Sequence, residues 1–138
     1  YNNIIIIYMN IRYLGYSNEL GEAFRPILPY LIIPSYIIAV GYMIYDSYTK
    51  AKKAKNKVSK FIDTIIWQSL ATILIPSYVI HKIVYFTKDI IKDIEIINKY
   101  KILKDYLPSV IGILSIFFIM QPIDDLVDYV MDNTIRKL

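Results

Sequence analysis

The chain has 138 residues, carries a formal net charge of +4, and is 56% hydrophobic with only 20% charged residues. Soluble domains average about 45–50% apolar and about 25% charged residues, and this length allows one domain. The lack of cysteine and the single histidine, His81, argue against a disulfide framework, a thiolate nucleophile and a multi-histidine metal centre. We therefore expect one membrane domain over residues 1–138, with no cofactor or metal.

The chain begins with an arm and a polar helix. Residues 1–11 are rich in Asn and Ile without a clear period, which predicts an extended arm. Residues 12–25 have an apolar stripe on one face and Glu19, Glu22 and Arg25 on another, which predicts an amphipathic helix leading into the membrane. Two glutamates are typical of acid–base catalysis, but no nucleophile or metal ligand accompanies them, so a polar-faced helix is favoured.

Glycines in this first helix predict close packing. Gly15 and Gly21 have no side chain, which lets another backbone approach. We expect both positions to contact a neighbouring helix.

Three long runs without a charged side chain follow. They cover residues 26–45, 64–80 and 106–123 and have 20, 17 and 18 residues. A hydrocarbon core about 30 Å thick needs about 20 helical residues. The runs therefore predict an all-α membrane protein with about three transmembrane helices, joined by amphipathic interfacial helices.

Prolines interrupt the uncharged runs. Pro34 and Pro76 each remove one hydrogen bond to a carbonyl in the preceding turn, so both predict kinks. The freed carbonyls, on Tyr30 and Thr72, need partners from neighbouring helices or hydroxyls. The words IPSYI (33–37) and IPSYV (75–79) recur at these prolines, through either duplication or chance in an Ile-rich chain.

A lysine-rich loop is predicted over residues 46–63, which hold six lysines and two aspartates. The positive-inside rule places such a loop on the side where the chain was made. Anionic lipid, cardiolipin above all, is the expected partner, because no nucleic-acid-reading element accompanies the charges. The expected lipid contacts are Lys50, Lys52, Lys53 and Lys55.

In the second run, Trp67 is predicted to anchor the helix at the membrane interface. Gln68 is predicted to form a hydrogen bond with another helix. After it, residues 82–105 show an apolar stripe at three- and four-residue spacing, which predicts a helix in the membrane interface or against a partner. No ionisable group lies inside the three runs, which disfavours a channel or transporter.

Residues 124–138 predict a C-terminal amphipathic helix with acids at its start and bases at its end, as the helix dipole favours. Asp124 and Asp128 lie one turn apart and would face one ion together. No ligand-gathering loop accompanies them, so helix-start electrostatics is the favoured reason for the acids.

Three stretches together resemble the signatures of one family. They are RYLGY, NE and GEAFR between residues 12 and 25; DT, WQ, LA and IP between 63 and 76; and PID, VD and RKL between 122 and 138. The chain is thereby identified as a member of the mitochondrial fission process protein 1 family, also called the mitochondrial 18 kDa protein family. The signature and packing residues singled out are Arg12, Gly15, Glu19, Gly21, Glu22, Arg25, Trp67, Gln68, Pro76, Pro122, Asp124, Asp128 and Arg136.

The resemblance implies a multi-pass protein of the mitochondrial inner membrane that acts in fission and organelle shape. It implies no catalytic residue and no cofactor, so the chain is not expected to be an enzyme. Gln121 stands where relatives often place histidine. An accessory subunit of a respiratory complex or of ATP synthase is the alternative, because the chain has little soluble domain. Both functions would act through lipid and protein contacts.

Overall fold

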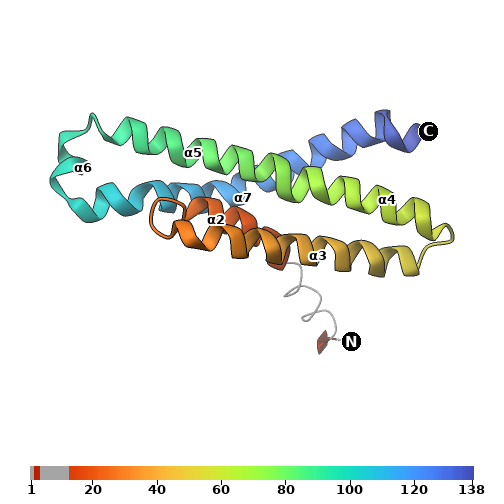
Figure 1. Cartoon of the computed structure of the whole chain (residues 1–138). Coiled ribbons are helices and arrows are strands. Elements are labelled where there is room, and N and C mark those ends of the chain that lie inside the picture. The colour runs from red at the N-terminus through yellow and green to blue at the C-terminus, as the bar shows by residue number, and fades with distance from the viewer. Residues whose placement is uncertain (1, 4–12) are drawn as a thin grey trace.

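A computed structural model describes residues 2–3 and 13–138 (Figure 1). Most of the predicted arm over 1–11, together with Arg12, lies outside the described residues. From Tyr13 onward the chain is helical. Its elements are η1 (Tyr13–Tyr16), α2 (Ser17–Ala23), η2 (Pro29–Leu31), α3 (Ile32–Lys52), α4 (Lys57–Gln68), η3 (Ser69–Leu74), α5 (Ile75–Ile91), α6 (Glu95–Lys99), α7 (Lys101–Asn133) and η4 (Ile135–Lys137).

Three rods dominate the molecule and are long and apolar enough to cross a membrane, which confirms the predicted fold class. They cover Pro29–Lys52, Lys57–Ile91 and Lys101–Lys137, with 24, 35 and 37 residues. The second rod joins α4, η3 and α5 without a break. At 1.5 Å per residue it is roughly 50 Å long, well beyond a hydrocarbon core of about 30 Å. The two longer rods therefore extend past the membrane-crossing portion.

The rods pack as antiparallel neighbours (Figure 1). A short turn over residues 53–56 joins α3 to α4, and α6 joins α5 to α7 at the opposite end of the molecule. Helix α2 lies inside this arrangement and packs on α3, α5 and α7. Two buried apolar clusters hold α7 to its neighbours. The first is Ala23, Ile80, Val84 and Ile116, and the second is Ala71, Ile123, Val127 and Met131.

The predicted lysine-rich loop over 46–63 is mostly helical. Helix α3 continues through Lys52, and α4 begins at Lys57, where the Asn56 side chain accepts a hydrogen bond from the Ser59 amide at 3.1 Å. Lysine is a good helix former, and asparagine is a preferred N-cap residue. Local helix propensity therefore reduces the loop to a four-residue turn.

The separate amphipathic helices predicted over 82–105 and 124–138 do not form. Residues 82–91 complete α5, while α6 and the start of α7 divide the rest of the first segment. Pro122 lies inside α7 and does not end it. Proline is tolerated within membrane helices because neighbouring groups satisfy the freed backbone. The acids after Pro122 therefore occupy the last third of a helix, and the prediction that they start one is wrong.

Candidate functional site: a polar helix inside the bundle

Helix α2 is the most unusual element, because it carries polar side chains into the interior. Asn18 and Glu19 are fully buried, and Glu22 is 3% exposed. Burying such groups is expensive unless they are hydrogen-bonded or neutral. The helix is therefore packed inside the bundle and does not lie on its surface, as an amphipathic segment would. It forms a short fourth strut between the three rods.

Glycines permit this close packing. A Cβ atom added at Gly21 would collide with the Ser35 side chain on α3. One added at Gly15 would lie 2.9 Å from the Tyr42 ring, also on α3. On the other side, a Cβ at Gly112 of α7 would lie 3.2 Å from the Cβ of Ala23. Small residues on both contacting surfaces thus let α2 enter the bundle.

Asn18 donates a hydrogen bond to a backbone carbonyl that a proline leaves without its helical partner. Its Nδ2 donates to the Thr72 carbonyl at 3.2 Å and to Ser77 Oγ at 2.5 Å. Thr72 is the residue whose carbonyl loses its helical partner at Pro76, and η3, a π-helical turn, lies at this point. On the opposite side, Ser17 Oγ donates to the Ser35 carbonyl at 2.8 Å. The serines of both IPSY words therefore flank α2.

Glu22 is the centre of a hydrogen-bonded cluster. Arg25 donates to it through Nε and Nη2, both at 2.8 Å, and Tyr36 Oη donates at 2.9 Å. His81 Nδ1 lies 3.2 Å from the same carboxylate. Burial alone would raise the pKa of Glu22, but the hydrogen bonds from Arg25 and Tyr36 outweigh it and hold the pKa below its ordinary value. The cluster ties α2 to α3 and α5 through a charged carboxylate.

Glu19 is in a different environment. Neither of its carboxylate oxygens has a hydrogen-bond partner among the described residues. Burial, and secondarily the negative charge of Asp124, raise the pKa of Glu19 above its ordinary value. Two carboxylates on one helix thus have opposite pKa shifts. Glu22 is stabilised as an anion, and Glu19 as a neutral acid.

A second cluster lies at the end of the bundle where α3 turns into α4. The segment over residues 50–56 there, with Lys50, Lys52, Lys53 and Lys55, is called the lysine turn below. Arg136 Nε donates to Asp63 of α4 at 2.8 Å, and its Nη1 donates to Asp128 at 3.0 Å and to Asp132 at 2.7 Å. This arginine offsets acids that lie near the C-terminal end of α7, where the helix dipole disfavours them. Arg136 thus holds η4 against α4.

Gln68 connects the first two rods near the same end. Its Nε2 donates to Asp46 of α3 at 2.7 Å, and its Oε1 accepts from Thr72 Oγ1 at 2.8 Å. Lys50 lies 2.7 Å from the same Asp46 carboxylate. Trp67 is half-buried against the second apolar cluster. The described residues contain no group of three or more His, Cys, Asp or Glu side chains that could hold a metal ion.

Comparison with known proteins identifies the family. The model of the mitochondrial 18 kDa protein family matches residues 3–63 and 50–131. The chain belongs to this family. Proteins named mitochondrial fission process protein 1 are 33% identical in Caenorhabditis elegans, 32% in Homo sapiens and 30% in Danio rerio. Each alignment covers 93% of this chain, and 84%, 83% and 84% of the respective relative. No solved structure matches the chain.

The mitochondrial 18 kDa family is a mitochondrial fission protein family not known as enzymes. Of the residues that the sequence analysis singled out, Glu22 and Arg25 meet in one cluster, and Asp128 and Arg136 meet in the other. Asp124 interacts electrostatically with Glu19. Arg12 lies outside the described residues. The two clusters are separate, and no single site gathers all the signatures.

Four residues that shape these clusters were not among the predicted site residues: Asn18, Tyr36, Asp63 and His81. One signal could have found the first. The carbonyl freed by Pro76 needs a donor, and an asparagine beside Glu19 in a family motif can supply it. No comparable signal was available for Tyr36, because its hydroxyl partner lies 14 positions away on another helix.

Proposed function

We propose that the chain is a multi-pass protein of the mitochondrial inner membrane that promotes fission and shapes the organelle without catalysing a reaction. The match to the fission process family along almost the whole chain carries this proposal, supported by three rods able to span a membrane. The relatives carry the fission process in their names. Glu22 serves the fold, since Arg25 and Tyr36 occupy its carboxylate.

The mode of action we propose is contact with lipid and with other membrane proteins. Lys50 and Lys52 end α3, and Lys53 and Lys55 lie in the turn that follows. The C-terminal basic residues, Arg136 and Lys137, lie at the same end of the molecule (Figure 1). Basic groups gathered at one end favour an anionic surface such as one containing cardiolipin. That end would face the matrix by the positive-inside rule.

The second candidate is an accessory subunit of a large inner-membrane assembly, either a respiratory complex or ATP synthase. Such a subunit would cover an exposed apolar surface. Phe117 and Phe118 of α7 are 73% and 80% exposed. In the most apolar stretch of this rod, only 22% is buried inside the molecule. Lipid tails or a larger protein could cover this surface equally well. The candidate therefore depends on the presence of a stoichiometric partner.

A complementation experiment tests the first proposal. Human cells without their own fission process protein would express this chain, and mitochondrial length would be measured by imaging. We expect mitochondria to shorten towards the wild-type length, because the alignment with the human relative covers 93% of this chain. Correct insertion without any change of length would contradict the fission proposal.

Native gel electrophoresis after mild detergent extraction separates the two candidates. Mass spectrometry of the band would identify the proteins that migrate with this chain. Migration as a small separate species would support the fission factor. Stoichiometric migration with a respiratory complex or ATP synthase would instead establish the accessory subunit.

A further inference from the structure

An open groove lies beside the Glu22 cluster, between α3 and α5. It has a volume of about 350 Å³. Its lining combines charged and hydroxyl groups with an apolar part formed by Ile73 and Leu74. The polar lining consists of Glu22, Arg25, Tyr36, Ser77, Tyr78 and His81.

The basic side chains of this groove are accessible although the carboxylate is not. The side chains of Arg25 and His81 are 41% and 42% exposed, while that of Glu22 is 4% exposed. Arg25 uses Nε and Nη2 on Glu22, and its Nη1 donates to none of the described residues. Lys82 adds a charge at the rim, where its Nζ lies 5.5 Å from the centroid of the Tyr78 ring. An anion at the mouth would therefore meet the remaining donor of Arg25 and the ammonium group of Lys82.

Arg25 and His81 lie at the level of the bundle where a lipid headgroup is expected. Arg25 directly precedes the first uncharged run and His81 directly follows the second. Because both contact Glu22, these two boundaries lie at one level of the bundle. Charged residues that end apolar runs mark the region where a membrane meets water. A lipid phosphate lies in that region.

A second, shallow groove lies next to the first on the surface of α3. It has a volume of about 380 Å³ and is lined by Ile32, Ile33, Tyr36, Ile37 and Val40. Tyr36 belongs to both grooves. From Ile32 to Val40 the helix rises roughly 12 Å, away from the charged boundary and towards the middle of the rod. A polar groove beside an apolar one matches the two parts of an amphiphile.

We propose that these neighbouring grooves bind one anionic phospholipid, with its phosphate beside Arg25, His81 and Lys82 and an acyl chain along Ile33, Ile37 and Val40. The site is distinct from the lysine turn. The turn lies at the far end of α3 (Figure 1), whereas Arg25 precedes the start of α3. The inference rests on the membrane insertion proposed above. It adds a specific lipid to the general attraction of a basic surface.

Native mass spectrometry of the purified full chain in detergent tests the site. Delipidated protein would receive phosphatidylglycerol or phosphatidylcholine with the same acyl chains. We expect retention of one phosphatidylglycerol and much weaker retention of phosphatidylcholine. The double variant H81Q/K82Q keeps a hydrogen-bonding group beside Glu22 and should lower phosphatidylglycerol retention at least about fivefold, since a basic residue near such a lipid contributes about 1 kcal/mol.

Matched variants separate binding in these grooves from a general attraction between lysines and anionic lipid. K88Q/K99Q removes two exposed lysines nearer the α6 end and should leave retention unchanged. I37W fills the apolar groove and should reduce retention, whereas I44W, on the same helix outside the groove, should not. Thermal unfolding of each variant identifies any that fails to fold.

Three results would overturn the site. They are equal loss in H81Q/K82Q and K88Q/K99Q, normal retention by I37W, and displacement of the lipid by an equal concentration of inorganic phosphate. Failure of the wild-type chain to insert into liposomes would contradict the proposed function itself. Insertion without selective lipid retention would reject only this site.

Discussion

At the residue scale, Glu19 and Glu22 show how position decides chemistry. They lie three positions apart on one short helix, and both are buried. Glu22 is bonded by Arg25 and Tyr36, whereas Glu19 has no hydrogen-bond partner among the described residues. The sequence placed both on one polar face of an amphipathic helix. The structure divides that face into a stable anion and a neutral acid.

The first prediction concerns Glu19 and pH. Because its folded pKa is raised from an ordinary value near 4.5, the folded state binds an extra proton once the pH exceeds that value. Stability should therefore fall as the pH rises from about 4.5 through the folded pKa, and the folded state should be favoured at acid pH. E19Q should remove this slope in thermal unfolding of the purified chain in detergent. E19D retains the carboxyl group and is the control. An unchanged slope in E19Q would exclude Glu19 as its source.

A second residue-scale prediction concerns Arg136. It contacts Asp63 across 73 positions of sequence, with its side chain 31% and that of Asp63 21% exposed. R136Q should lower the free energy of unfolding by about 1 kcal/mol, because partly exposed pairs contribute little. K137Q, one position further on, should have a smaller effect. Thermal unfolding measures both. A loss in R136Q no larger than in K137Q would show that the network adds no stability.

At the element scale, α2 is the part that the sequence placed least well. Its stripe of apolar residues and its polar face are typical of an interfacial helix. Three neighbouring helices bury it because Gly21 and Gly112 remove the atoms that would keep them apart. Asn18 then supplies the hydrogen bond that Pro76 leaves open. Packing and polar satisfaction together stabilise a helix that has only seven residues.

The element-scale prediction uses two glycines on different surfaces. G21L should displace α2, because even a Cβ at this position meets the Ser35 side chain. Such overpacking costs about 1–3 kcal/mol. G41L is the control, because a Cβ at Gly41 has no heavy atom within 4 Å. Membrane insertion and proteolysis of α2 in liposomes would be measured. Insertion should remain normal in both, and equal protection of α2 in both would contradict the packing.

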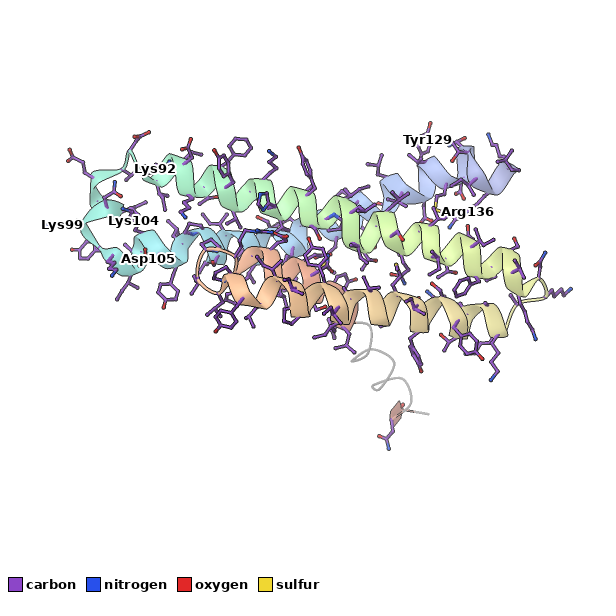
Figure 2. The ribbon with its side chains drawn as sticks, viewed as in Figure 1. Lys92, Lys99, Lys104, Asp105, Tyr129 and Arg136 are labelled. Atoms are coloured by element: carbon purple, nitrogen blue, oxygen red, sulfur yellow. The ribbon has the colours of Figure 1, made fainter. Side chains whose placement is uncertain are left out.

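At the scale of the whole molecule, the longest run of basic residues without an acid lies at one end. Both ends hold charges of both signs: Figure 2 shows Lys92, Lys99, Lys104 and Asp105 at the α6 end and Arg136 at the other, where it bonds three aspartates. The lysine turn lies at the Arg136 end (Figure 1) and carries a large excess of positive charge. Orientation and lipid contact should therefore depend on this end.

The whole-molecule prediction neutralises that end. Changing Lys50, Lys52, Lys53 and Lys55 to Gln should weaken binding to cardiolipin liposomes roughly a hundredfold or more, because each lysine near an anionic surface contributes about 1 kcal/mol. The same four changes at Lys88, Lys99, Lys101 and Lys104 form the control. Liposome flotation at several salt concentrations measures the effect. Equal loss from the two quartets would mean that total charge, and not the lysine turn, determines lipid contact.

The sequence by itself determined the three rods, the basic end and the family. Each follows from a property of neighbouring residues: uncharged runs long enough to cross a bilayer, lysines close together, and signatures in order. The boundaries of the helices were less predictable. The sequence predicted separate helices before and after residue 123, but α7 runs through Pro122 to Asn133, because a proline is tolerated within a membrane helix.

Only the tertiary structure decided which polar groups meet. Glu22 joins Tyr36 and His81, which lie 14 and 59 positions away, and Arg136 joins Asp63. Periodicity describes one helix at a time, and it does not say which face another helix will cover. The interior position of α2 therefore depends on the fit between Gly21, Gly112 and their neighbours, a property of several helices together.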